Sequence, residues 1–201
     1  MIMDWLEYEN KAYESGYNIV CGVDEAGRGP LAGPVYAAAV VLAKGYVVDG
    51  VNDSKKLSEK RRNELFDIIK EEAVTYGIGI IDAARIDEIN ILQATYEAMR
   101  SAINNLNPSP DILLNDAVTI PKVDIKQVPI IKGDAKSISI AAASVLAKVT
   151  RDRIMEEYDK KYPEYGFAKH KGYGTKQHIQ ALEQFGASPI HRRTFITKFV
   201  P

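Results

Sequence analysis

Residues 17–42, with the sequence YNIVCGVDEAGRGPLAGPVYAAAVVL, give the clearest indication of the fold. An apolar run over residues 17–24 predicts a strand that ends at Asp24. A glycine-rich turn follows over residues 27–33, and a second apolar run, residues 35–42, predicts a buried strand. The stretch therefore predicts two strands of an α/β unit joined by a tight turn.

The rest of the chain is predicted to alternate between helices and strands. Helices are expected over residues 3–14, 59–73, 83–105 and 137–158, and further strands over residues 46–48, 74–81, 111–116 and 128–131. Ser58 is a predicted N-cap, a break is expected near Asn90, and Pro129 indicates an edge strand. The alternation after residue 50 favours parallel strands with helical crossovers. Because no repeat or linker divides the sequence, residues 1–201 are predicted to form one domain.

The composition is that of an ordinary globular protein. The chain has 201 residues, of which 46% are hydrophobic, and a net charge of -1. Its one cysteine, Cys21, excludes an internal disulfide and a thiolate zinc site, and it indicates a reducing, cytoplasmic compartment. Acids near the N-terminus and the lack of a long apolar run predict neither secretion nor membrane insertion.

The charge is distributed unevenly along the chain. Residues 132–201 hold 13 Lys and Arg against 7 Asp and Glu, whereas residues 1–131 hold 13 against 20. A basic C-terminal part can bind a polyanion, because neutralising phosphates releases counterions. A solvated surface of no special function explains the same charges, so both interpretations stay open.

Four carboxylates are candidates for a shared site. Asp24 and Glu25 end the first predicted strand, Asp116 ends a later one, and Asp134 precedes the long helix. In open α/β sheets, sites form beyond the carboxyl ends of parallel strands. Four acids that converge there need a divalent cation, and carboxylate oxygens suit Mg²⁺ or Mn²⁺. Taken singly, each acid is also typical of a turn or a helix cap.

The glycine turn differs from the known phosphate loops. Ala32 stands where the dinucleotide pattern requires its third glycine, and a strand follows in place of a helix. The segment before Ser137 resembles the end of a nucleotide triphosphate loop, but Val128 stands where that loop needs its first glycine. The turn can instead bring backbone groups close to a ligand, with Arg28 as a phosphate donor. A simple tight turn remains the alternative.

Several motifs resemble those of the ribonuclease HII family, and they occur in the family's order. They are GVDEAGRGPLAGP at residues 22–34, DSKKL at residues 53–57, KGDAKS at residues 132–137, AAASVLAKVTRD at residues 141–152 and HKGYGT at residues 170–175. The resemblance covers residues 17 to about 195. One departure is Asn115, which stands where the family usually places an apolar residue before its third acid.

The resemblance implies an RNase H-like fold, in which a mixed central β-sheet with an antiparallel second strand is flanked by helices. The core would span about residues 17–160, and a helical, basic C-terminal portion would span about residues 161–201. It also implies metal ligation and catalysis by four acids, and substrate binding by a second group of residues. The ligands would be Asp24, Glu25, Asp116 and Asp134, and the substrate-binding residues Gly27, Arg28, Gly29, Tyr173, Lys55, Lys148, Lys169 and Lys171.

The activity implied by the resemblance is hydrolysis by two Mg²⁺ or Mn²⁺ ions, which activate a water without a side-chain nucleophile. The partners would be RNA/DNA hybrids and DNA duplexes that contain ribonucleotides, cut on the 5′ side of the ribonucleotide to leave a 3′-hydroxyl and a 5′-phosphate. A monomer without an obligate protein partner is expected. His170, between two lysines, is more typical of a surface residue than of a proton shuttle.

Two other classes of function stay open at this point. A non-catalytic hybrid-binding module would use the basic part and the glycine turn without four clustered acids. Another metal-dependent phosphodiesterase on the same fold, such as a phosphatase or resolvase, would not depend on the 2′-hydroxyl.

Overall fold

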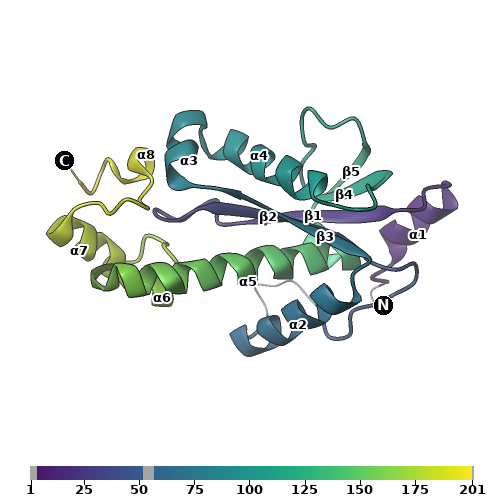
Figure 1. Cartoon of the computed structure of the whole chain (residues 1–201), viewed down its shortest axis with the longest axis horizontal. Coiled ribbons are helices and arrows are strands. Elements are labelled where there is room, and N and C mark those ends of the chain that lie inside the picture. Colours follow the sequence, from purple (N-terminus) through teal and green to yellow (C-terminus); the bar gives the residue numbers. More distant parts are fainter. Residues whose placement is uncertain (1–3, 52–56, 201) are drawn as a thin grey trace.

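The computed structural model of the chain describes residues 4–51 and 57–200. A five-stranded sheet in the order β3-β2-β1-β4-β5 runs through its centre, with helices on both faces (Figure 1). The strands are β1 (Val20–Ala26), β2 (Val35–Val41), β3 (Thr75–Ile81), β4 (Ile112–Asp116) and β5 (Lys126–Ile130).

The sheet is mixed, as the resemblance implied. β2 pairs antiparallel with both β1 and β3, whereas β1, β4 and β5 run parallel to one another. β5, which contains Pro129, lies at the edge of the sheet as predicted. The predicted strand at residues 46–48 is wrong, because that segment forms no ladder. Its Val48 is instead buried, as a member of the apolar cluster that also includes Val40, Leu65 and Leu146.

The predicted helices are found close to their expected positions. The α-helices are α1 (Glu7–Glu14), α2 (Glu59–Glu72), α3 (Ala83–Ile89), α4 (Ile91–Asn104), α5 (Ile138–Lys161), α6 (Phe167–His170), α7 (Lys176–Phe185) and α8 (Arg193–Ile196), and the short 3-10 helices are η1 (Gly133–Ala135) and η2 (Pro163–Tyr165). The Ser58 side chain caps α2, and the Asn90 side chain caps α4 where the predicted break lies. Within the described ranges, no helix is both long and apolar enough to span a bilayer.

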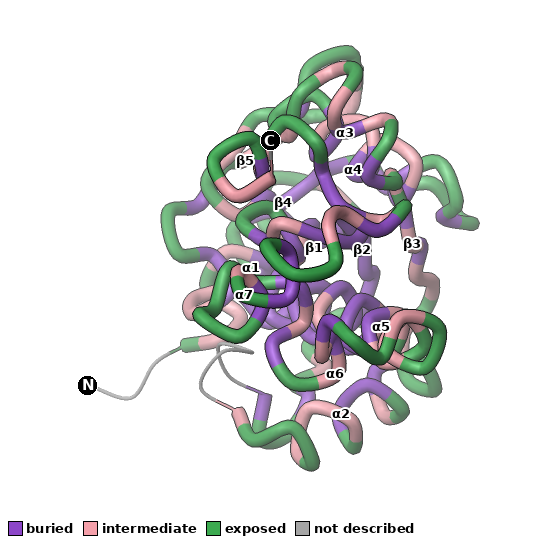
Figure 2. Tube along the Cα trace, turned by 90° about the vertical axis from the view of Figure 1, so that its left-hand side faces the viewer, coloured by how far each residue is buried: buried purple, intermediate pink, exposed green. Residues whose placement is uncertain are grey.

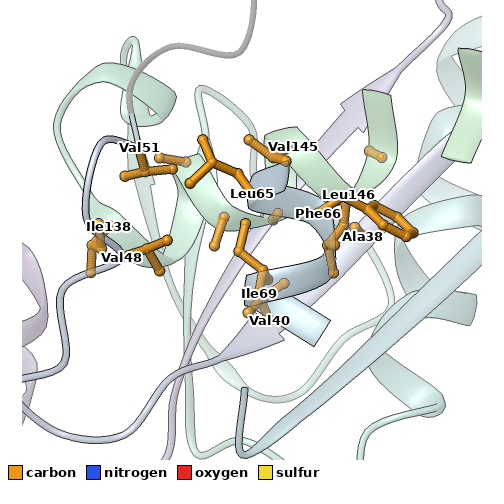
Figure 3. Packing of buried hydrophobic residues seen from close by; sticks show 14 of the residues in the cluster. Ala38, Val40, Val48, Val51, Leu65, Phe66, Ile69, Ile138, Val145 and Leu146 are labelled. Atoms are coloured by element: carbon orange, nitrogen blue, oxygen red, sulfur yellow. The ribbon is translucent and has the colours of Figure 1, made fainter. Parts of the chain in front are cut away.

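One face of the sheet is covered by α5 and α2. Apolar residues of β2, α2 and α5 meet there in a buried cluster (Figure 3). The small residues at positions 141–144 of α5 are buried, and the helix lies directly against β1. A Cβ on Gly22 would lie 2.1 Å from the Ser139 carbonyl carbon, so glycine permits this approach.

The other face is covered by α3 and α4, which pack on a second apolar cluster. Two glycines of β3 allow α4 to approach closely. A Cβ on Gly77 would lie 2.0 Å from the Ala102 carbonyl oxygen, and one on Gly79 would lie 1.9 Å from that of Ala98. The sheet is therefore buried between two helical layers (Figure 1).

The C-terminal elements α6, α7 and α8 gather at one end of the molecule (Figure 1). This end points toward the viewer in Figure 2. They enclose a third apolar cluster that includes Phe167 and Leu182. The glycine turn after β1 joins them through its backbone. Leu31 donates its N–H to Gly172 (2.8 Å), and Gly33 donates to Ile190 (2.8 Å). The turn is thus bonded to two segments more than 130 residues away.

Candidate active site

Two acids meet where neighbouring strands end. Val23 of β1 is paired in parallel with Asn115 of β4. The residues that follow them, Asp24 and Asp116, therefore lie at the same edge of the sheet. This is the position at which α/β sheets form sites, and it confirms that the strand ends bring these two acids together.

Asp24 is held by groups of the strand and of α5. Its side chain is 5% exposed, and its Oδ1 accepts a hydrogen bond from the Glu25 N–H (2.8 Å). The Ser144 hydroxyl of α5 donates a second hydrogen bond to the Asp24 carboxylate. Because Gly22 allows α5 to lie on β1, Ser144 comes within reach of the strand.

The electrostatic surroundings of Asp24 are unfavourable for its charge. Burial raises the pKa of Asp24 well above its usual value, and the charges of Glu25 and Asp116 raise it further. Only the hydrogen bonds from the Glu25 N–H and Ser144 oppose this shift. The site thus holds negative charge that its own hydrogen bonds do not offset.

Asp116 and Asp134 are linked through η1. The Gly133 N–H donates to Asp116 Oδ1 at 2.7 Å. Asp134, the next residue, is 6% exposed. The cap of α5 is the hydroxyl of Ser137, which accepts from the Ile140 N–H at 3.3 Å. Asp134 therefore does not serve as the N-cap of the long helix.

The donor chemistry fits a hard divalent cation. Asp24, Glu25, Asp116 and Asp134 offer only carboxylate oxygens, which Mg²⁺ and Mn²⁺ prefer. A cation would also offset the charge that raises the pKa of Asp24. Over residues 4–51 and 57–200, however, no three acidic, histidine or cysteine side chains are arranged closely enough to hold a metal. Asp24, Glu25 and Asp116 are neighbours, and Asp134 follows the residue that donates to Asp116, but the four acids do not form an assembled ligand set.

A pocket of about 460 Å³ opens beside Asp24. It is lined by Asp24, Glu25, Ala26, Gly27, Arg28, Gly29, Arg62, Ser144, Lys148, Arg151 and Tyr173. Seven predicted site residues, namely Asp24, Glu25, Gly27, Arg28, Gly29, Lys148 and Tyr173, therefore lie around one space. Asp116, Asp134, Lys169 and Lys171 are not in its lining, and Lys55 lies outside the described residues.

Several predicted substrate-binding side chains already have partners. The Lys148 ammonium contacts Asp152 (2.7 Å), and that of Lys171 contacts Glu156 (2.6 Å). Arg28 forms a looser ion pair with Glu25 at 3.3 Å. Tyr173, by contrast, is 46% exposed at the pocket wall.

Sequence reasoning missed four residues that line the pocket, namely Ala26 and three with polar side chains. Arg62 of α2 and Ser144 and Arg151 of α5 were not among the predicted site residues. Ser144 and Arg151 belong to the motif at residues 141–152, so their spacing on one helix was the available signal. Arg62 lies in an ordinary charged helix and carried no such signal.

The interpretation of His170 as a surface residue is wrong. Its side chain is 7% exposed and stacks on His178 with ring centroids 4.5 Å apart. Its Nε2 lies 2.8 Å from the Tyr165 carbonyl oxygen, to which it donates. Flanking lysines did not predict this burial, because the C-terminal apolar cluster forms only in the folded chain.

Comparisons with known proteins identify the family. The family model described as "Ribonuclease HII" matches residues 21–198. The chain belongs to the ribonuclease HII family. The ribonuclease HII of Clostridioides difficile is 64% identical over 189 residues, which cover 94% of this chain and 74% of that protein.

Solved structures support the same family and fold. Ribonuclease H2 from Pyrococcus horikoshii matches with a TM-score of 0.73 and 32% identity, over 88% of this chain and 93% of that one. Ribonuclease HII from Archaeoglobus fulgidus, solved as a complex with PCNA, matches with a TM-score of 0.73 and 27% identity, over 87% and 93%. The RNase H-like fold expected from the motifs is thereby confirmed.

Proposed function

We propose that the pocket beside Asp24 is the active site of a divalent-metal-dependent ribonuclease HII. As a member of this family, the chain cleaves RNA in RNA/DNA hybrids and at ribonucleotides embedded in DNA. The cut falls on the 5′ side of the ribonucleotide and leaves a 3′-hydroxyl and a 5′-phosphate. The observation that carries the proposal is one pocket in which buried, uncompensated Asp24 faces the glycine turn.

Asp24, Glu25, Asp116 and Asp134 would hold Mg²⁺ or Mn²⁺. When bound, such ions activate a water and stabilise the departing oxygen. Asp24 suits this role, because burial and then the charges of Glu25 and Asp116 raise its pKa, and a bound cation would offset that repulsion. The Gly133 N–H would keep Asp116 oriented toward the site.

The glycine turn and Tyr173 would select the ribose. Backbone groups of Gly27, Arg28 and Gly29 can approach a 2′-hydroxyl, which is both a donor and an acceptor. Tyr173 stands next to them, since a Cβ on Gly29 would lie 3.7 Å from its ring. Its exposed ring would stack on the neighbouring sugar, while Lys148, Lys169 and Lys171, together with Lys55, would contact phosphates.

The proposal extends to the domain organisation, the oligomeric state and the protein partners. Residues 1–201 would act as one domain, as a monomer in the cytoplasm, without an obligate protein partner. The Archaeoglobus relative was solved in complex with PCNA, so a protein similar to PCNA is the non-obligate partner to test first.

A DNA duplex with one ribonucleotide tests the proposal directly. With Mg²⁺ or Mn²⁺ we expect one cut at the ribonucleotide's 5′ side, and a continuous RNA/DNA hybrid serves as the comparison substrate. Tyr173→Ala should reduce activity on the single-ribonucleotide duplex more than on the hybrid, and Tyr173→Phe should retain the stacking part. Binding without cutting would indicate a hybrid-binding module, and equal cutting of an all-DNA duplex would indicate another phosphodiesterase.

A further inference from the structure

The buried Arg192 contacts the backbone of the glycine turn. Its side chain is fully buried, just before α8. Its guanidinium donates to three carbonyl oxygens, those of Gly27 (2.6 Å), Arg28 (2.8 Å) and Gly33 (3.0 Å). No ion pair between Arg192 and an acid occurs in the described part of the chain; its partners are these carbonyls and the ring of Phe195, whose centroid lies 5.2 Å from the guanidinium carbon. The guanidinium of Arg192 therefore holds the turn by three hydrogen bonds, and Arg192 is not among the residues that line the pocket.

A buried arginine without an ion-pair partner is costly for the fold. Burial, together with the nearby charge of Arg151, lowers the pKa of Arg192 to about 9, and the charge of Asp87 opposes this shift. Burying a charge is tolerated only when its donors are hydrogen-bonded. The contacts to the turn thus account for the presence of a charge at this position.

The two contacts at Gly27 and Arg28 determine where the turn's amides point. In a trans peptide the C=O and N–H of one plane are directed oppositely. When Arg192 holds the Gly27 carbonyl, the Arg28 N–H of that plane faces away from the guanidinium. The same holds for the Arg28 carbonyl and the Gly29 N–H. Over the described residues, neither of these N–H groups has a hydrogen-bond partner, and both residues line the pocket.

The residue beside Arg192 is linked by hydrogen bonds to Tyr173, which also lines the pocket. His191 Nε2 lies 2.9 Å from His178 Nε2, and His178 Nδ1 lies 2.9 Å from the Tyr173 carbonyl oxygen. Because a carbonyl only accepts, His178 carries its proton on Nδ1 and accepts from His191 at Nε2. His191 Nδ1 in turn accepts from the Ser188 N–H (2.9 Å). Each ring nitrogen of this pair is satisfied in one neutral tautomer.

We propose that Arg192 is a positioning residue that aims the Arg28 and Gly29 amides at the 2′-hydroxyl, and that His191 fixes the Tyr173 turn to the same segment. This inference rests on the proposed function, since it assumes that these amides face a ribose. It assigns a specificity role to a residue that contacts no substrate itself.

Binding affinities for two duplexes test the role of Arg192. They are identical except for one ribonucleotide and are measured with Ca²⁺ as the divalent ion, with their integrity checked afterwards. We expect Arg192→Lys, which lacks the planar fork, to lose about tenfold in preference for the ribonucleotide duplex. Affinity for the all-DNA duplex should stay unchanged. Equal loss on both duplexes, or an unchanged preference, would overturn the inference.

Arg151→Lys is the matched control. Arg151 is also buried and donates to three carbonyls, those of Ala32, Pro34 and Lys171, but to neither Gly27 nor Arg28. Its loss should affect both duplexes alike. Arg192→Gln is measured in parallel. It removes the buried charge, so its folding does not require a charged group to be buried at this position.

A measurement on the wild type keeps the test independent of the variants. The amide resonances of Arg28 and Gly29 should shift when the ribonucleotide duplex is added and not with the all-DNA duplex. Equal shifts would overturn the inference even if no Arg192 variant folds. Failure of the wild type to cut the ribonucleotide duplex with Mg²⁺ or Mn²⁺ would instead overturn the proposed function itself.

Discussion

Asp24 at the end of β1 and Arg192 ahead of α8 are both buried charged residues, but their surroundings differ. Every nitrogen of the Arg192 guanidinium donates to a carbonyl oxygen of the chain. Asp24 receives two hydrogen bonds yet faces the charges of Glu25 and Asp116. The charge at the acid end of the pocket is thus only partly offset by hydrogen bonds, whereas the donors of Arg192 are all satisfied by the fold. The comparison separates an acid whose charge a cation would offset from an arginine whose hydrogen bonds hold the glycine turn.

The buried histidines extend this contrast. Burial lowers the pKa of His178 to about 4 and that of His191 to about 3, so both are neutral at pH 7. Their hydrogen bonds suit the neutral rings, as the Ser188 and Tyr173 contacts require. Burial thus keeps these two histidines neutral, whereas the acid end holds several negative charges close together.

Replacement of Asp24 by Asn should have the largest effect. We expect activity to fall by more than about 100-fold. Loss of a residue that only hydrogen-bonds to a metal ligand costs up to about 100-fold, and loss of a ligand itself should cost more. Without metal, the melting temperature should stay equal or rise, because Asn removes one of several repelling charges. Mg²⁺ should raise the melting temperature of the wild type and raise that of the variant less. A large drop in the variant's metal-free melting temperature would make Asp24 a structural residue.

The two ends should respond oppositely to pH. The folded pKa values of His178 and His191 lie below their usual 6.5, so their stabilising contribution is complete above pH 6.5 and is lost on acidification toward about 4 and about 3. Asp24 has a raised folded pKa, so its penalty is present at neutral pH and is relieved as pH falls through that value.

Urea unfolding between pH 7.5 and 4.5 measures this difference. The wild type should lose stability below pH 6.5, and His178→Gln should lose less over the same range. Asp24→Asn should keep the histidine-dependent loss while removing the opposing gain. An identical pH dependence of the wild type and His178→Gln would show that the histidine is not neutral in the fold.

Substitution of exposed lysines should have the smallest effect. Lys169→Ala and Lys176→Ala should each lower the slope of log affinity against log salt by about 0.9, equally for all duplex sequences. Lys171→Ala should change it less, because Lys171 is paired with Glu156. Binding at 50 to 200 mM salt measures the slopes, and unchanged slopes for Lys169 and Lys176 would leave these lysines as solvated surface.

Most of the helices and strands, and the approach of Asp24 to Asp116, were predictable from local patterns in the sequence. Apolar runs before Asp24 and Asp116 predicted strands, and parallel strands end at one edge of a sheet, so their meeting was predictable. The small residues at positions 141–144 predicted a closely packed helix, which the approach of α5 to Gly22 bears out. Such patterns are local, because each one depends only on residues that are close to one another in the sequence.

Which hydrophilic side chains become buried, and which apolar run becomes a strand, depends on packing between segments that are distant in the sequence. His170 and Arg192 occur in basic, hydrophilic stretches, and Val48 in an apolar one that forms no strand. Arg192 is satisfied by carbonyls 159 to 165 positions earlier in the chain, and no local period encodes such a contact. The physical reason is that burying a charge depends on finding all of its hydrogen-bond partners at once, and those partners come together only when distant segments pack.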